Sequence, residues 1–106
     1  MAKYTCDIQV VAGKVAVTTT PPRPVDGFHK DDEITFKCAE PGAAIKYTRS
    51  SPFDAVAKGT LVKVGAAGKT FIVGTRGPAQ NHYDCGQIVG GVFTPWGGGD
   101  KTPTNP

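Results

Sequence analysis

Apolar and polar side chains alternate with a period of two residues along most of the chain. Near the N-terminus, polar residues separate four apolar positions, namely Tyr4, Cys6, Ile8 and Val10. Such alternation is typical of a strand with one buried face. Strand-like segments recur along the chain at 14–20, 33–39, 44–49, 61–64, 70–73, 82–89 and 92–94. The pattern therefore predicts about eight short strands.

Glycine and proline stand where the alternation stops. Turns are predicted at four places, each containing glycine: 12–13, 40–43, 65–68 and 90–91. The proline-rich segment 21–24 cannot pair inside a sheet and is expected to be a connector. No segment sustains a helix, and residues 53–58 hold at most one helical turn. A single curled sheet would leave one face open, so we expect an all-β fold of two packed sheets.

Length and composition favour a single domain. The chain has 106 residues, and its 14 glycines and 9 prolines suit short strands joined by turns. From Pro95 onward the sequence is rich in glycine and proline. We therefore expect one β-sandwich domain over residues 1–95 and a flexible C-terminal tail over residues 96–106.

Charge and hydropathy narrow the range of partners. The net charge of +3 is small and scattered, and aromatic residues do not interleave with the basic ones, so no nucleic-acid partner is expected. No apolar run approaches the roughly 20 residues of a membrane helix, so no membrane span is expected. No leader is visible in the sequence. The protein is then cytoplasmic, or secreted or periplasmic if Met1 replaces a removed leader, and the compartment stays open.

Several segments in order resemble the cupredoxin family. The acidic-apolar stretch Asp31–Phe36 is followed by the turn Glu40–Ala43, and Lys69–Val73 later leads to His82–Gly86. In pattern and order these segments resemble cupredoxin domains over roughly residues 13–95. The resemblance implies a Greek-key β-sandwich in which an F-x-V strand precedes the strand that carries the copper-binding thiolate, at Cys85.

The ligand set of a blue-copper site is incomplete. Such a site needs two imidazoles, one thiolate and usually a weak thioether ligand. Cys85 matches the thiolate, but no histidine follows it and the only methionine is Met1. Where the resemblance expects the first histidine, the chain has Ala43-Ala44-Ile45. We therefore expect a cupredoxin-like domain without copper and without another cofactor.

A second resemblance is to the immunoglobulin-like sandwich. Tyr83-Asp84-Cys85 resembles its tyrosine corner, and Cys38 lies on an earlier strand. This resemblance implies an inter-sheet disulfide between Cys38 and Cys85. The residues alone leave open whether one bridge forms or all three cysteines stay reduced. The core tryptophan of that family has no counterpart, because Tyr47 stands in its region and the only tryptophan is Trp96.

Catalytic and metal-binding patterns are sparse. The one candidate metal cluster combines His29, His82 and Cys85. Residues 82 and 85 differ by three positions, so on a regular strand their side chains face opposite sides of the sheet. No nucleophile elbow and no phosphate-binding loop is readable in the sequence. We expect no metal site and no enzymatic activity.

Association with another molecule is the expected function. Sandwich modules bind through their end loops or through the edges of their sheets. The long predicted loops 20–32, 50–58 and 75–81 carry the candidate binding residues Arg23, Phe28, His29, Phe53 and Arg76. An aromatic side chain in a loop is more often a lid over the core, which is the alternative for Phe28 and Phe53. We expect a binding or structural module whose partner is a protein or a second copy of the chain. The alternative is a metal-binding or redox protein that uses copper at Cys85 with His82 or His29.

Overall fold

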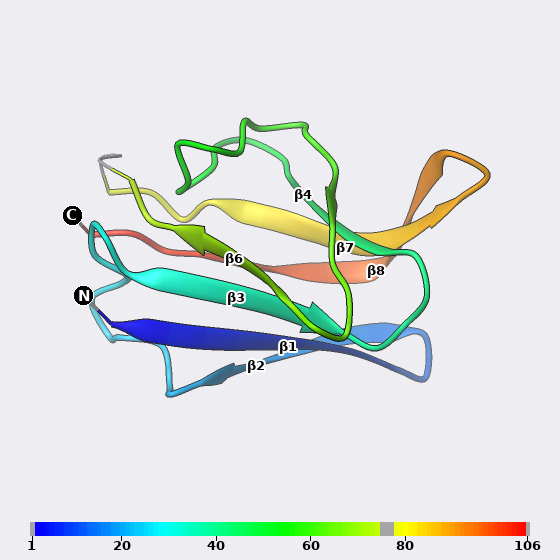
Figure 1. The fold of residues 1–106 in the computed structure, drawn as a ribbon, viewed down its shortest axis with the longest axis horizontal. Helices are drawn as coiled ribbons and strands as arrows, with labels where there is room; N and C mark the ends of the chain where they lie inside the picture. Colours follow the sequence, from blue (N-terminus) through cyan, green and yellow to red (C-terminus); the bar gives the residue numbers. More distant parts are fainter. Residues whose placement is uncertain (1, 75–77, 106) are drawn as a thin grey trace.

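The computed structural model describes residues 2–74 and 78–105, and these residues form two four-stranded sheets packed face to face (Figure 1). No helix occurs in this part of the chain, so none is long and apolar enough to cross a membrane. The predicted all-β, two-sheet architecture is confirmed. Its strands are β1 (Lys3–Val11), β2 (Lys14–Thr20), β3 (Glu33–Cys38), β4 (Ala43–Tyr47), β5 (Val62–Lys63), β6 (Lys69–Ile72), β7 (His82–Val89) and β8 (Val92–Lys101).

The two sheets differ in how their strands pair. The first sheet has the order β2-β1-β3-β6, and the second has the order β5-β4-β7-β8. Strands β1 and β3 are parallel, with Cys6 opposite Phe36, whereas every other strand pair in the two sheets is antiparallel. Periodicity alone could not give this order, because it says which face of a strand is buried but not which strand lies beside it.

Aromatic rings fill the space between the sheets. Phe36 on β3 packs edge-on against Tyr83 on β7, with the ring centroids 5.6 Å apart. It also contacts Phe53 edge-on at 6.1 Å and Phe71 at 6.5 Å. Edge-to-face pairs at these distances add to the free energy gained from burying each ring. The alternation read from the sequence thus places its apolar positions in one shared core.

Short and long connections lie at opposite ends of the sandwich (Figure 1). The strands are joined by short turns at one end, which we call the turn end and define as residues 11–14, 38–43, 63–69 and 89–92. The other end, which we call the loop end, comprises residues 20–32, 48–61, 73–74 and 78–81. Both chain termini lie at the loop end.

The C-terminal residues form part of the second sheet. The sequence predicts a tail from residue 96, but residues 96–101 continue strand β8. The glycines there fit a close approach of strands, because a Cβ at Gly99 would collide with the carbonyl oxygen of Tyr83. The following Thr102 and Thr104 are 2% and 5% exposed. The glycine-rich composition that resembles a flexible tail therefore reflects the close packing of strand β8 against its neighbour.

Asn81 anchors this C-terminal segment to the loop end. Its side-chain amide donates hydrogen bonds to the carbonyl oxygens of Thr102 (2.8 Å) and Ala79 (3.4 Å) and to the hydroxyl of Thr104 (3.1 Å). Its Oδ1 accepts a hydrogen bond from the Ser50 hydroxyl at 2.7 Å. The residue has φ 52°, a left-handed conformation that asparagine tolerates better than most residues. One buried side chain thus joins three segments.

The Asn81 anchor predicts a measurable loss of stability. Asn81→Gly keeps the left-handed backbone accessible but removes all four hydrogen bonds, so we expect it to lower the free energy of unfolding by about 2–4 kcal/mol. Urea denaturation measures this loss. Thr48→Ala is the control, because its exposed hydroxyl makes one hydrogen bond of 3.3 Å to the His82 carbonyl oxygen. Equal unfolding midpoints for the two variants would contradict the anchoring role.

Candidate functional site

Two aromatic side chains from the loop end, Phe28 and Phe53, are buried in the core. Phe28 and Phe53 are 1% and 0% exposed. The Phe28 ring packs edge-on against Tyr4 with centroids 4.8 Å apart, and the Phe53 ring stacks on Phe71 at 5.2 Å. Neither ring is available to a partner, so the alternative expected from the sequence, a lid over the core, holds at both positions. Their burial depends on tertiary packing that a non-periodic loop sequence does not reveal.

A buried carboxylate holds the entry to β3. Asp32 is 5% exposed, and its two carboxylate oxygens accept hydrogen bonds from the backbone N–H groups of Ala2 (3.0 Å) and His29 (2.9 Å). Carboxylates that accept backbone N–H groups make strong, charge-assisted hydrogen bonds. Sequence reasoning missed this role of Asp32, although aspartate side chains are known to accept a hydrogen bond from a backbone N–H group three residues earlier. The acidic run before β3 is thus partly structural.

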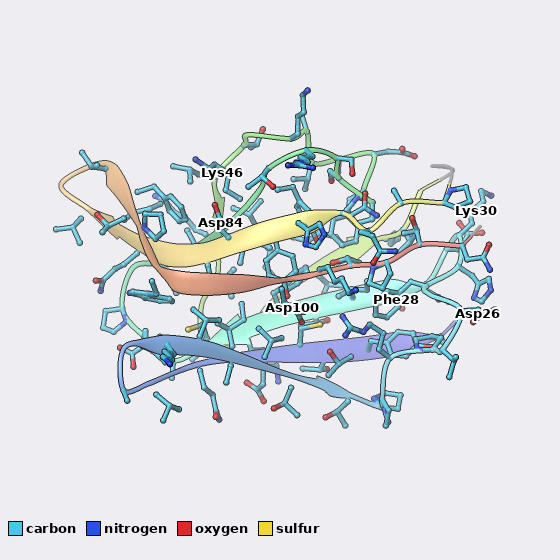
Figure 2. All side chains as sticks on the ribbon, turned by 180° about the vertical axis from the view of Figure 1, so that it is seen from behind. Asp26, Phe28, Lys30, Lys46, Asp84 and Asp100 are labelled. Atoms are coloured by element: carbon cyan, nitrogen blue, oxygen red, sulfur yellow. The ribbon has the colours of Figure 1, made fainter. Side chains whose placement is uncertain are left out.

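Of the remaining candidates, Arg23 and His29 have partners within the chain. The Arg23 guanidinium donates a hydrogen bond to the Lys101 carbonyl oxygen at 3.0 Å and lies 3.6 Å from the Asp100 carboxylate. The exposed His29 imidazole lies 3.4 Å from the Asp26 carboxylate, and Asp26 is labelled at this end in Figure 2. Arg76, the last candidate, lies outside the described residues. Arg23 therefore ties the connector before β3 to the end of β8.

An open groove of about 520 Å³ also lies at the loop end. It is lined by Arg49, Ser50, Ser51, Val56, Ala57, Lys58, Pro78, Ala79 and Asn81. The amide of Asn81 is already used in the anchor described above. Arg49 and Lys58 are exposed. The groove thus exposes the cationic side chains of Arg49 and Lys58. The Asn81 amide in its wall is occupied by hydrogen bonds within the chain.

All three cysteines are free, buried thiols. Burial, with a smaller contribution from the negative charge of Asp100, raises the pKa of Cys85 to about 12. Burial also raises the pKa values of Cys6 and Cys38. Thiols with raised pKa values are protonated at neutral pH and are poor nucleophiles and ligands. A disulfide between Cys38 and Cys85 is not formed in the structure and stays a prediction.

The three candidate metal ligands point to different environments. On β7, Tyr83 and Cys85 are buried in the core, whereas His82 is exposed on the outer face of the sheet. The expectation that residues 82 and 85 face opposite sides is therefore confirmed. His29 is exposed at the loop end. Over residues 2–74 and 78–105, no group of three or more His, Cys, Asp or Glu side chains is placed to hold a metal ion.

The turn end carries exposed apolar side chains that sequence reasoning did not single out. Val11, Val89 and Val92 are 61%, 58% and 64% exposed. Val89 and Val92 are paired across the β7–β8 hairpin, one position closer to its tip than the pair Ile88 and Phe93. Figure 1 shows this hairpin projecting from the body of the sandwich. Alternation predicts these strands, but it does not tell where a strand leaves the core.

The hairpin is held in a defined conformation. Gly90 and Gly91 have φ values of 58° and 80°, as the two central residues of a type I′ turn require. At its base the Phe93 ring lies over Gly86, where a Cβ would collide with it. The Lys46 ammonium sits 5.2 Å from the centre of the same ring, and Lys46 lies on the outer face of the second sheet (Figure 2). The tip is therefore an exposed apolar surface on an ordered support.

A second open groove of about 520 Å³ lies beside this hairpin. Its lining residues are Gly42, Ala43, Lys63, Val64, Gly65, Gly68, Lys69 and Ile88. Gly42 and Ile88 also make a direct contact, because the Ile88 N–H donates a hydrogen bond of 2.8 Å to the Gly42 carbonyl oxygen. The groove therefore places two lysines next to the base of the apolar hairpin.

Comparison with known proteins gives no assignment. No family model matches the sequence, no curated protein matches it significantly, and no solved structure matches it significantly. The cupredoxin-like and immunoglobulin-like resemblances therefore stay predictions.

Proposed function

We propose that the protein is a cupredoxin-like β-sandwich without copper that acts by association and catalyses no reaction. The order of the strands supports the cupredoxin-like fold. Strand β3 begins at the end of the acidic run 31–33, and β6 leads to β7, which carries Cys85. The parallel pairing of β1 with β3 favours it over the immunoglobulin-like alternative, because sheets of that fold are antiparallel.

The environment of Cys85 argues against the copper-binding alternative. Its thiol is 0% exposed in the core and has a pKa of about 12, while His82 lies on the other face of β7. Copper binding would require a thiolate and two imidazoles around one ion. The described residues would have to rearrange to bring these groups together.

Copper titration tests this part of the proposal. We expect no thiolate-to-copper absorption band when stoichiometric Cu²⁺ is added at neutral pH, because the buried Cys85 thiol stays protonated and His82 cannot reach its side of the sheet. Visible absorption spectroscopy measures the band. A band that Cys85→Ala removes and His82→Asn weakens would establish the metal-binding alternative instead.

The turn end is the proposed surface for association. The observation that carries this proposal is the pair Val89 and Val92, each more than half exposed at the tip of a projecting hairpin. At the loop end Phe28 and Phe53 are buried, and the exposed Val25 lies on a connector outside the strands. An ordered hairpin also loses little conformational entropy on binding, which favours association.

Sedimentation velocity tests the turn end without requiring a known partner. Exposed apolar surface also pairs with itself at high concentration, so we expect the sedimentation coefficient to rise with protein concentration. The double variant Val89→Asp/Val92→Asp should abolish this rise. Ile72→Asp is the matched control, because Ile72 is 56% exposed but lies on the outer face of β6. A rise that the control removes and the double variant keeps would place the association surface on the sheet.

A further inference from the structure

The charges at the turn end have mostly one sign. Its charged residues are Lys14, Lys63 and Lys69, with Glu40 as the single acid. The described loop end mixes both signs, since residues 20–32 alone contain Arg23 and Lys30 together with Asp26, Asp31 and Asp32. The apolar tip of the sandwich is therefore accompanied by mostly basic side chains, whereas at the opposite end basic and acidic side chains are mixed.

The basic and apolar groups are adjacent. Lys63 and Lys69 line the groove beside the hairpin, and Ile88 at the base of the hairpin lines the same groove. Val89 and Val92 follow directly beyond it as a cross-strand pair on one face. A binding partner that contacts the hairpin tip is therefore also close to Lys63 and Lys69.

We infer that the turn end attaches the protein peripherally to an anionic lipid surface, an inference that rests on the proposed function. The tip of the β7–β8 hairpin enters the boundary between headgroups and acyl chains, and Lys14, Lys63 and Lys69 lie over the anionic headgroups. Reversible attachment of this kind combines a shallow apolar insertion with a basic patch, because neither is sufficient alone.

The size of the apolar tip favours a lipid surface over a protein partner. A stable protein interface buries at least about 1,000 Å² with a well-packed apolar centre, so contact between two tips is limited to weak pairing at high protein concentration. Two valines at a hairpin tip offer a small, convex apolar surface, and the adjacent groove is open and rimmed by lysines. A bilayer accepts such a tip without a complementary pocket, and its negative charge complements the lysines.

Vesicle co-sedimentation tests the inference with the full chain. We expect binding to phosphatidylcholine vesicles that contain phosphatidylserine and much weaker binding to phosphatidylcholine alone, with a loss of binding as salt is raised. Val89→Asp/Val92→Asp should lower the partition coefficient about tenfold or more, because each valine loses its burial in the interface. Ile72→Asp should leave it unchanged.

Lysine variants separate the charge at the turn end from the charge of the whole chain. Lys63→Ala/Lys69→Ala should lower the partition coefficient about tenfold. Lys30→Ala/Lys58→Ala changes the net charge equally but acts at the loop end, and should have a much smaller effect. Equal losses in the two double variants would overturn the inference, because binding would then depend on net charge alone.

The outcomes also separate this inference from the proposed function. Absence of vesicle binding, or equal binding to both lipid compositions, overturns the lipid inference. If sedimentation still shows association that depends on Val89 and Val92, the turn end contacts a second copy and the proposed function stands. If neither vesicles nor a second copy associate through this end, both the inference and the proposed turn-end surface fail.

Discussion

Phe36 packs against rings from both sheets, and this contact holds the two layers together. Its partner Tyr83 belongs to the facing sheet, while Phe71 lies on β6 and Phe53 on a loop. Because Phe53 belongs to the long connection between β4 and β5, the same cluster also fixes the loop end. The aromatic core therefore extends into the loop end, where Phe53 is fully buried.

The two ends of the sandwich differ in where their apolar side chains lie: the loop end buries Phe28 and Phe53 and exposes Val25, and the turn end exposes the pair Val89 and Val92. At the loop end, Phe28 and Phe53 fill the interior, Asp32 holds the start of β3, and Asn81 binds the C-terminal segment. At the turn end, tight turns hold the strands without covering Val89 and Val92. Backbone order and apolar exposure thus coincide at the turn end, a combination that lowers the entropic cost of binding.

The sequence predicts the strands better than it predicts the site. Alternation places β7 and its hairpin correctly, because one face of the strand is buried along most of its length. It misses the second half of β8, where Gly99 is required by the close approach of Tyr83 and resembles a tail in composition. It also leaves open whether Phe28 and Phe53 form contacts or cover the core, since the burial of a loop residue depends on distant segments. The sequence does not single out Val89 and Val92, because the strand-like pattern of residues continues unchanged where β7 and β8 extend beyond the core.

Hydrogen–deuterium exchange with and without anionic vesicles tests most directly whether the turn end is the contact surface. We predict that amides of residues 11–14, 63–69 and 89–92 gain protection in the presence of vesicles, while those of residues 48–61 and 78–81 exchange at unchanged rates. Protection confined to the loop-end segments, with the β7–β8 hairpin unaffected, would contradict this prediction.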